Sequence, residues 1–150
     1  MALTQNSSGK TARILLVEDN PGDVRLAQEA FRECPLRCEV RVANDGRAAL
    51  EALRGEGGRE TAYRPDLILL DLNLPVMDGR RILAEIKSDP RLRSIPVVVL
   101  TTSRSDDDVT RAYDLHANAY IPKPVDMDHF VEVIRKVEDF WFATVKLPSE

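Results

Sequence analysis

The chain has 150 residues, of which 43% are hydrophobic and 31% are charged, and its formal net charge is −4. This length and balance are typical of one folded domain and exclude a disordered chain. No apolar run reaches the roughly 18 residues that a membrane-spanning helix needs, and the basic residues are dispersed, unlike those of nucleic-acid-binding proteins. We therefore expect a cytoplasmic protein that binds neither membranes nor nucleic acid.

Along the chain, residues 1–10 are rich in Ser, Thr, Asn and Gln and hold no apolar block, so we expect a disordered tail. Five short apolar runs with many β-branched residues follow. Three of these runs are apolar almost throughout, which is typical of strands buried on both faces of a parallel sheet. The five runs span residues 13–17, 38–43, 67–70, 97–100 and 119–121.

Segments with the apolar spacing of helices separate these runs. The first opens with Asn20, Pro21 and Asp23, which supply an N-cap, a proline at the first helical position and an acidic first turn. The alternation predicts an α/β fold, a doubly wound (βα)₅ sandwich around a parallel five-stranded sheet. The apolar positions that we expect to face the core are Val24, Ala27 and Phe31; Ala49, Leu50 and Leu53; Ile82, Leu83 and Ile86; Val109, Ala112 and Tyr113; and Phe130, Val133, Ile134, Val137, Phe140 and Trp141.

Acidic side chains follow two of the predicted strands. Glu18 and Asp19 come directly after the first strand, and Asp71 comes after the third. In a sheet of order 2-1-3-4-5 these strands are neighbours, so the three carboxylates converge at the switch point where ligands bind. Carboxylates so close repel one another unless a cation neutralises them, and hard oxygen ligands suit Mg²⁺. The sequence therefore predicts a magnesium site.

Two more strand ends supply groups that suit a phosphate. Thr101 follows the fourth predicted strand with a hydroxyl, and Lys123 follows the fifth with an ammonium. An aspartate can accept a phosphoryl group as an acyl phosphate, while a metal ion and a lysine neutralise charge on the transferring group. Asp71 is thus the candidate acceptor, although Thr101 alone could be an ordinary strand-end hydroxyl and Lys123 alone a solvated surface lysine.

Four motifs in order carry a resemblance to a known family. They are Val-Glu-Asp-Asn at 17–20, Asp-Leu-Asn-Leu-Pro-Val-Met-Asp-Gly at 71–79, Leu-Thr-Thr at 100–102 and Tyr-Ile-Pro-Lys-Pro at 120–124. Over about residues 11–140 the chain resembles the receiver domain of bacterial two-component response regulators. This resemblance implies a flavodoxin-like fold, no output domain, a sensor histidine kinase as partner, and Asp71 as the phosphoacceptor.

The resemblance also implies roles around Asp71. Asp19, Asp71 and the backbone carbonyl of Asn73 would bind Mg²⁺, and Glu18, in place of the commoner Asp, would act through a bound water. Such proteins catalyse only their own phosphotransfer and slow dephosphorylation. Thr101 and Lys123 would contact the phosphoryl group, and Tyr120 would be the aromatic switch. The peptide bond between Lys123 and Pro124 would be cis.

Two stretches, 18–26 and 140–148, resemble single-domain regulators that partner phytochrome-type kinases. Such regulators pair through the fourth and fifth helices and the last strand, which implies a homodimer here. Residues 141–150 would then form a C-terminal extension that contributes to the dimer, although its side chains could simply cap the core instead. The candidate dimer residues are Phe140, Trp141, Phe142, Val145 and Leu147.

Other functions remain open from the sequence. A phosphohydrolase with an aspartate nucleophile uses a second Asp two residues later, where this chain has Asn73. A flavin-binding protein of the same topology needs a phosphate-binding loop after strand one, where Glu18 and Asp19 would repel the phosphate. A degenerate receiver could serve only as a binding module. The chain also departs from the family in a long stretch, 54–65, that we expect to be a mobile surface loop.

Overall fold

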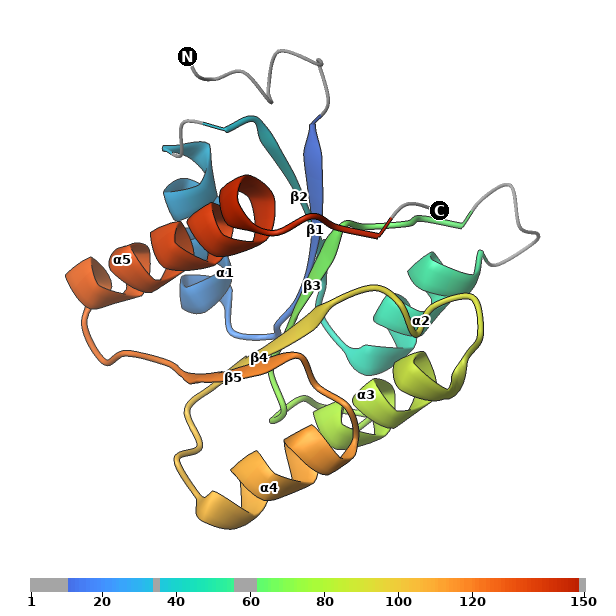
Figure 1. The fold of residues 1–150 in the computed structure, drawn as a ribbon. Coiled ribbons are helices and arrows are strands. Elements are labelled where there is room, and N and C mark those ends of the chain that lie inside the picture. The colour runs from blue at the N-terminus through green and yellow to red at the C-terminus, as the bar shows by residue number, and fades with distance from the viewer. Residues whose placement is uncertain (1–10, 34–35, 56–61, 149–150) are drawn as a thin grey trace.

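The computed structural model describes residues 11–33, 36–55 and 62–148. Its sheet contains five parallel strands in the order β2-β1-β3-β4-β5, which confirms the predicted fold class (Figure 1). The strands are β1 (Ala12–Val17), β2 (Cys38–Ala43), β3 (Leu67–Leu70), β4 (Val97–Thr101) and β5 (Ala119–Pro122). The tail at 1–10 lies outside the described residues, so that expectation stays a prediction.

Helices connect the strands and cover both faces of the sheet. Each of the five α-helices begins after a residue whose side chain accepts a hydrogen bond from a backbone N–H of the first turn. In Figure 1, α1 and α5 lie on one side of the sheet and α2, α3 and α4 on the other. The helices are α1 (Pro21–Arg32), α2 (Gly46–Arg54), α3 (Gly79–Ser88), α4 (Asp106–Asp114) and α5 (Met127–Glu138), which continues as a π-helical segment, η3 (Asp139–Thr144).

Two apolar cores flank the sheet because successive strand residues point to opposite faces. In β3, Ile68 and Leu70 pack with α2 and α3, whereas Leu67 and Leu69 pack with α1 and α5. All four of these side chains are fully buried. Burial on both faces explains why the central strands are continuously apolar, and it fixes the register that places their carboxyl ends at one edge.

Two expectations about packing are wrong. Tyr113 is 48% exposed, and Ala112 is the one buried residue of α4. Phe140 is 50% exposed because the buried stripe of α5 continues four residues beyond Val137, at Trp141. Of the stretch predicted as a mobile surface loop, Arg54 ends α2, and Tyr63 is buried with its N–H donating to the Ala52 carbonyl. Residues 56–61 lie outside the described residues, so the mobility stays a prediction.

Candidate functional site

The carboxyl ends of the strands gather buried polar side chains at one edge of the sheet. Five polar or charged residues are buried among the described residues, and four of them lie here: Glu18 after β1, Asp71 after β3, Thr101 at the end of β4 and Lys123 after β5. Burying charge is costly unless the groups are paired, so such a concentration indicates a site. This confirms the prediction from the sequence that these four side chains lie at the same edge of the sheet.

Three carboxylates at this edge could hold a metal ion. Glu18, Asp19 and Asp71 each offer an oxygen, and these oxygens lie within 4.8 Å of one another. Glu18 is buried, and Asp19 is exposed to solvent, which leaves an open side for water ligands. Burial raises the pKa of Glu18 to about 7, against the opposing hydrogen bond and charge of Lys123. The donor set fits a hard divalent cation that would favour the ionised carboxylates.

The Lys123 ammonium lies among carboxylates. Its Nζ donates to Glu18 Oε1 at 2.5 Å, to Asp23 Oδ2 at 2.8 Å and to Asp71 Oδ2 at 3.1 Å. Burial alone would lower the pKa of Lys123, but the hydrogen bonds to Asp23 and Glu18 and the charge of Asp71 outweigh it and raise this pKa. Lys123 therefore stays charged at neutral pH, with all three of its N–H groups engaged.

The second oxygen of Asp71 is held by different partners. Thr101 Oγ1 donates to Asp71 Oδ1 at 2.8 Å, and the backbone N–H of Asn73 donates to the same atom at 3.1 Å. Asn73 Nδ2 lies 3.4 Å from Thr101 Oγ1. Asp71 thus has one oxygen facing Lys123 and the other facing a hydroxyl and an amide. The predicted metal-ligand role of the Asn73 carbonyl stays a prediction.

Tight backbone packing also fixes the start of α3 against the site. A Cβ atom on Gly79 would lie 2.4 Å from the Asp71 carbonyl oxygen and 2.6 Å from Leu72 Cα. The Gly79 N–H donates to the Leu72 carbonyl at 3.0 Å. Only glycine allows this approach, so Gly79 does more than open a helix, which was all that the Asp78-Gly79 pair indicated in the sequence.

The candidate switch residue lies beside the site. The Tyr120 hydroxyl donates to the Ser103 carbonyl at 2.9 Å, and its ring is half-buried against the core of the α2–α4 face. Ser103 Oγ donates to Asp108 Oδ2 at 2.6 Å, and Asp108 Oδ1 pairs with Arg80 Nη2 at 2.6 Å. These contacts join β5, the β4–α4 loop and the start of α3.

Two findings at this edge differ from the sequence analysis. Among the described residues no peptide bond is cis, so the expectation for Lys123 and Pro124 is wrong, and the bond has the trans form that proline peptides favour by about 0.5–1 kcal/mol. Sequence reasoning missed Asp23, which it assigned only to the acidic first turn of α1. Asp19 precedes the N-cap of α1, so no helical spacing in the sequence connects Asp23 with the site.

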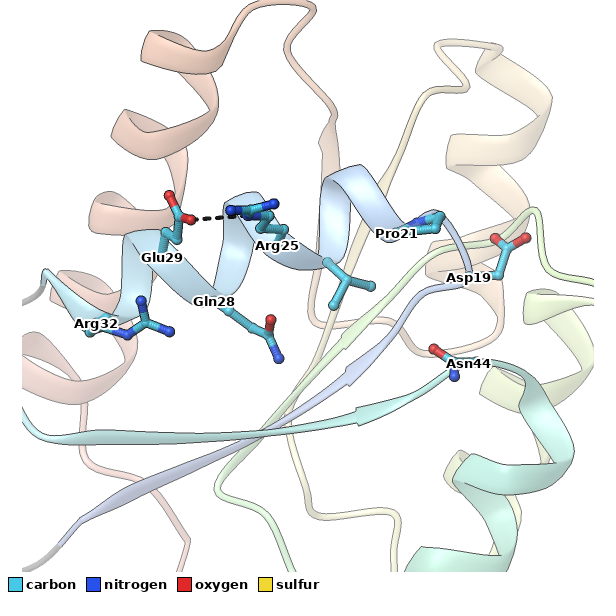
Figure 2. A pocket seen from close by; sticks show the side chains of 8 residues that line it. Asp19, Pro21, Arg25, Gln28, Glu29, Arg32 and Asn44 are labelled. Carbon is cyan, nitrogen blue, oxygen red and sulfur yellow. Dashed lines mark hydrogen bonds and ion pairs between the residues drawn. The ribbon is translucent and has the colours of Figure 1, made fainter.

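A hollow of about 740 Å³ begins at Asp19 and runs along the side of α1 that faces Asn44 after β2 (Figure 2). Figure 2 shows Arg25, Gln28 and Arg32 projecting along it from α1, with Asn44 on the opposite wall. Arg25 pairs with Glu29 at 3.3 Å. The hollow therefore has charged walls and opens beside an exposed carboxylate of the metal cluster.

A second hollow, of about 700 Å³ and mostly apolar, lies between β5, α5 and the C-terminal segment. Trp141 and Phe142 pack against the core beside α5, which fits the reading that they cap it. Phe140 is exposed and stacks edge-to-face on Trp141, with ring centroids 5.3 Å apart. Val145 lines the hollow and Leu147 is half-buried. The dimer roles of these five residues stay predictions.

Among the residues that the structure describes, no helix has the length and apolar character to cross a bilayer.

Comparison with known proteins matches residues 14–135 to the response regulator receiver domain family. Response regulator Rcp1 of Synechocystis sp. is 48% identical over 136 residues, which cover 91% of this chain and 92% of that protein. The phosphorylated cyanobacterial phytochrome response regulator RcpA is 51% identical, with a TM-score of 0.89 over 93% of this chain and 100% of that one. The Mn²⁺-bound form of Rcp1 is 47% identical, with a TM-score of 0.87 over 92% of this chain and 99% of that one.

Proposed function

Because the chain belongs to the response regulator receiver domain family, we propose that it is a phosphorylation switch in which Asp71 accepts a phosphoryl group from a sensor histidine kinase. The observation that carries this proposal is the setting of Asp71. It is a buried carboxylate held on one oxygen by Lys123 and on the other by Thr101, beside the acidic pair Glu18 and Asp19. Phosphorylation of the similar RcpA supports it.

The reaction is a transfer between two side chains. A carboxylate oxygen of Asp71 attacks the phosphorus of a phosphohistidine, the bond from phosphorus to nitrogen breaks, and its electron pair returns to the imidazole. Lys123 and Thr101 lie where charge collects on the phosphoryl oxygens, within hydrogen-bond distance of Asp71. They therefore bind and orient the group during transfer.

Mg²⁺ is the cofactor that we propose for this reaction. Asp19 and Asp71 would bind it with the Asn73 carbonyl, and Glu18 would act through a water molecule. Once bound, the ion supplies a positive charge that neutralises the transferring phosphoryl group. The Mn²⁺-bound form of the similar Rcp1 supports a divalent metal ion as the cofactor.

The acyl phosphate is a signal and not a catalytic intermediate with rapid turnover. The residue two positions after Asp71 is Asn73, whose amide can neither take up nor release a proton to activate water. We therefore propose that the protein catalyses only its own phosphorylation and slow dephosphorylation.

The kinase partner that we propose is of the phytochrome type, because the similar RcpA is a phytochrome response regulator. A kinase must bring its phosphohistidine to the open side of the metal cluster, which Asp19 faces. The hollow along α1 in Figure 2 begins there and offers apolar and charged groups to a docking helix. We place this exchange in the cytoplasm, where ATP supplies the kinase.

Output would pass through the face formed by α4, β5 and α5. Phosphorylation adds about −1.5 to −2 charge at Asp71, which draws the Thr101 hydroxyl toward the phosphate and frees space for the Tyr120 ring. The Tyr120 hydroxyl then leaves Ser103, and the surface of this face changes. A homodimer formed through this face and the C-terminal residues would respond to that change.

The test uses acetyl phosphate as donor, with and without Mg²⁺, and reads intact mass. The wild type should gain one phosphoryl group in the presence of Mg²⁺, and Asp71→Asn should gain none. Asp114→Asn, which removes an exposed carboxylate at the end of α4, serves as the matched control and should behave as the wild type. A wild type that gains no mass would contradict the proposal.

A further inference from the structure

Lys123 has one carboxylate partner that the switch does not explain. Its ammonium has three N–H groups, and these go to Glu18, Asp71 and Asp23. Glu18 and Asp71 belong to the cluster that could hold a metal ion, whereas Asp23 is outside that cluster. A metal ion or a phosphoryl group at the site would therefore compete with Lys123 for Glu18 and Asp71, but not for Asp23.

Asp23 is held in place by its own helix. It lies in the first turn of α1, and its backbone N–H donates to the N-cap side chain of Asn20 at 3.0 Å. Its side chain is 28% exposed, whereas that of Lys123 is 5% exposed. Asp23 therefore covers the ammonium from the solvent side, and its contact joins the start of α1 to the end of β5.

We propose that Asp23 is a positioning residue that holds the Lys123 ammonium against Asp71 for phosphoryl transfer. This inference rests on the proposed function of Asp71. A lysine side chain has four flexible carbon–carbon bonds, and a charge-assisted hydrogen bond to a fixed carboxylate restricts them before the donor arrives. The ammonium then needs no rearrangement when charge develops on the phosphoryl group.

The positioning role of Asp23 and its negative charge should affect different kinetic parameters of phosphorylation. The negative charge of Asp23 repels an anionic donor, so its removal should not weaken donor binding. Loss of positioning lowers the rate of the transfer step itself. Asp23→Asn should therefore lower the maximal rate of phosphorylation by acetyl phosphate about tenfold, with a half-saturating concentration that is unchanged or lower.

The experiment measures that rate against acetyl phosphate concentration at saturating Mg²⁺ for the wild type, Asp23→Asn and Asp23→Glu. The Glu variant keeps the carboxylate and should recover most of the maximal rate. Glu33→Gln is the matched control, because Glu33 lies at the other end of α1 and pairs with Arg135 of α5 at 3.7 Å on the surface. An unchanged maximal rate in Asp23→Asn would overturn the proposal, as would an equal loss in Glu33→Gln.

A second readout does not depend on phosphorylation. Proton exchange of the Lys123 ammonium, followed by NMR in the unphosphorylated protein, should be slow in the wild type and clearly faster in Asp23→Asn. Equal exchange in the two proteins would overturn the positioning role even if the rates differed. If the wild type accepts no phosphoryl group, the proposed function fails, whereas the exchange measurement still decides whether Asp23 holds Lys123.

Discussion

The two oxygens of Asp71 have different surroundings, and this difference organises the site at the scale of single residues. Oδ2 faces the Lys123 ammonium, and Oδ1 accepts from Thr101 and from the Asn73 N–H. In the switch that we propose, Lys123 neutralises charge on one side of Asp71, and Thr101 transmits the change at Asp71 to the end of β4. The Thr101 side chain is fully buried, so its hydroxyl cannot turn to solvent.

Replacing Thr101 by Val should separate phosphorylation of Asp71 from the response of Tyr120. The variant keeps the side-chain shape and loses the hydroxyl, so we expect the free energy of unfolding to fall by about 1 kcal/mol. Asp71 should still accept a phosphoryl group, because Lys123 and the acidic cluster are untouched. The ring resonances of Tyr120, which should shift on phosphorylation of the wild type, should shift much less in the variant.

The control for this variant is Thr102→Val, at the exposed neighbouring position. It should phosphorylate and switch as the wild type does. An equal Tyr120 shift in wild type and Thr101→Val would refute the role of the Thr101 hydroxyl in signalling.

At the scale of elements, the starts of α3 and α4 are joined by a chain of polar contacts. Arg80 pairs with Asp78 at 3.0 Å and with Asp108 at 2.6 Å, and Asp108 accepts from Ser103 at 2.6 Å. The carbonyl of Ser103 in turn accepts from Tyr120. The β4–α4 loop is therefore held from α3 on one side and from β5 on the other.

Removing Arg80 should loosen this loop. In Arg80→Met the Asp108 carboxylate loses its cation, so amide hydrogen exchange should rise over residues 103–109. The global free energy of unfolding should change by no more than about 1 kcal/mol, because the pair is partly exposed to solvent. The Arg81→Met control removes an exposed pair with Glu85 within α3 and should leave this exchange unchanged.

The sequence predicted the sheet well because each central strand is buried on both faces, which leaves an unbroken apolar run in the chain. It predicted Glu18, Asp71, Thr101 and Lys123 because residues at the carboxyl ends of parallel strands meet at one edge. Asp23 escaped prediction because its contact with Lys123 depends on where the first turn of α1 lies relative to the end of β5. The burial of Tyr63 escaped prediction because its sequence neighbours favour a loop, whereas the guanidinium groups of Arg13 and Arg41 lie over its ring.

At the scale of the whole molecule, the exposed apolar surface near the C-terminus lies on the face expected to change. Phe140, at the start of η3, lines the apolar hollow beside β5 and α5. This position fits a contact with a second copy of the chain, the homodimer that we propose. Trp141 and Phe142 pack against the chain's own core, as the sequence analysis expected for Trp141.

Phe140→Asp should therefore weaken the dimer without unfolding the monomer, because the side chain is half-exposed. Sedimentation velocity, with and without acetyl phosphate, should show the variant as a monomer at concentrations where the wild type is dimeric. Val125→Asp changes a residue that is 98% exposed in the β5–α5 loop and should leave the dimer intact. Identical sedimentation of wild type and Phe140→Asp would exclude Phe140 from the interface.

The most direct test of Asp71 as the phosphoacceptor is chemical mapping of the phosphorylated residue. Borohydride reduces an acyl phosphate on aspartate to homoserine, which peptide mass spectrometry can locate after treatment with acetyl phosphate and Mg²⁺. We predict homoserine at position 71 and at no other aspartate. Homoserine at another position, or none in a protein that has gained phosphoryl mass, would contradict the assignment of Asp71.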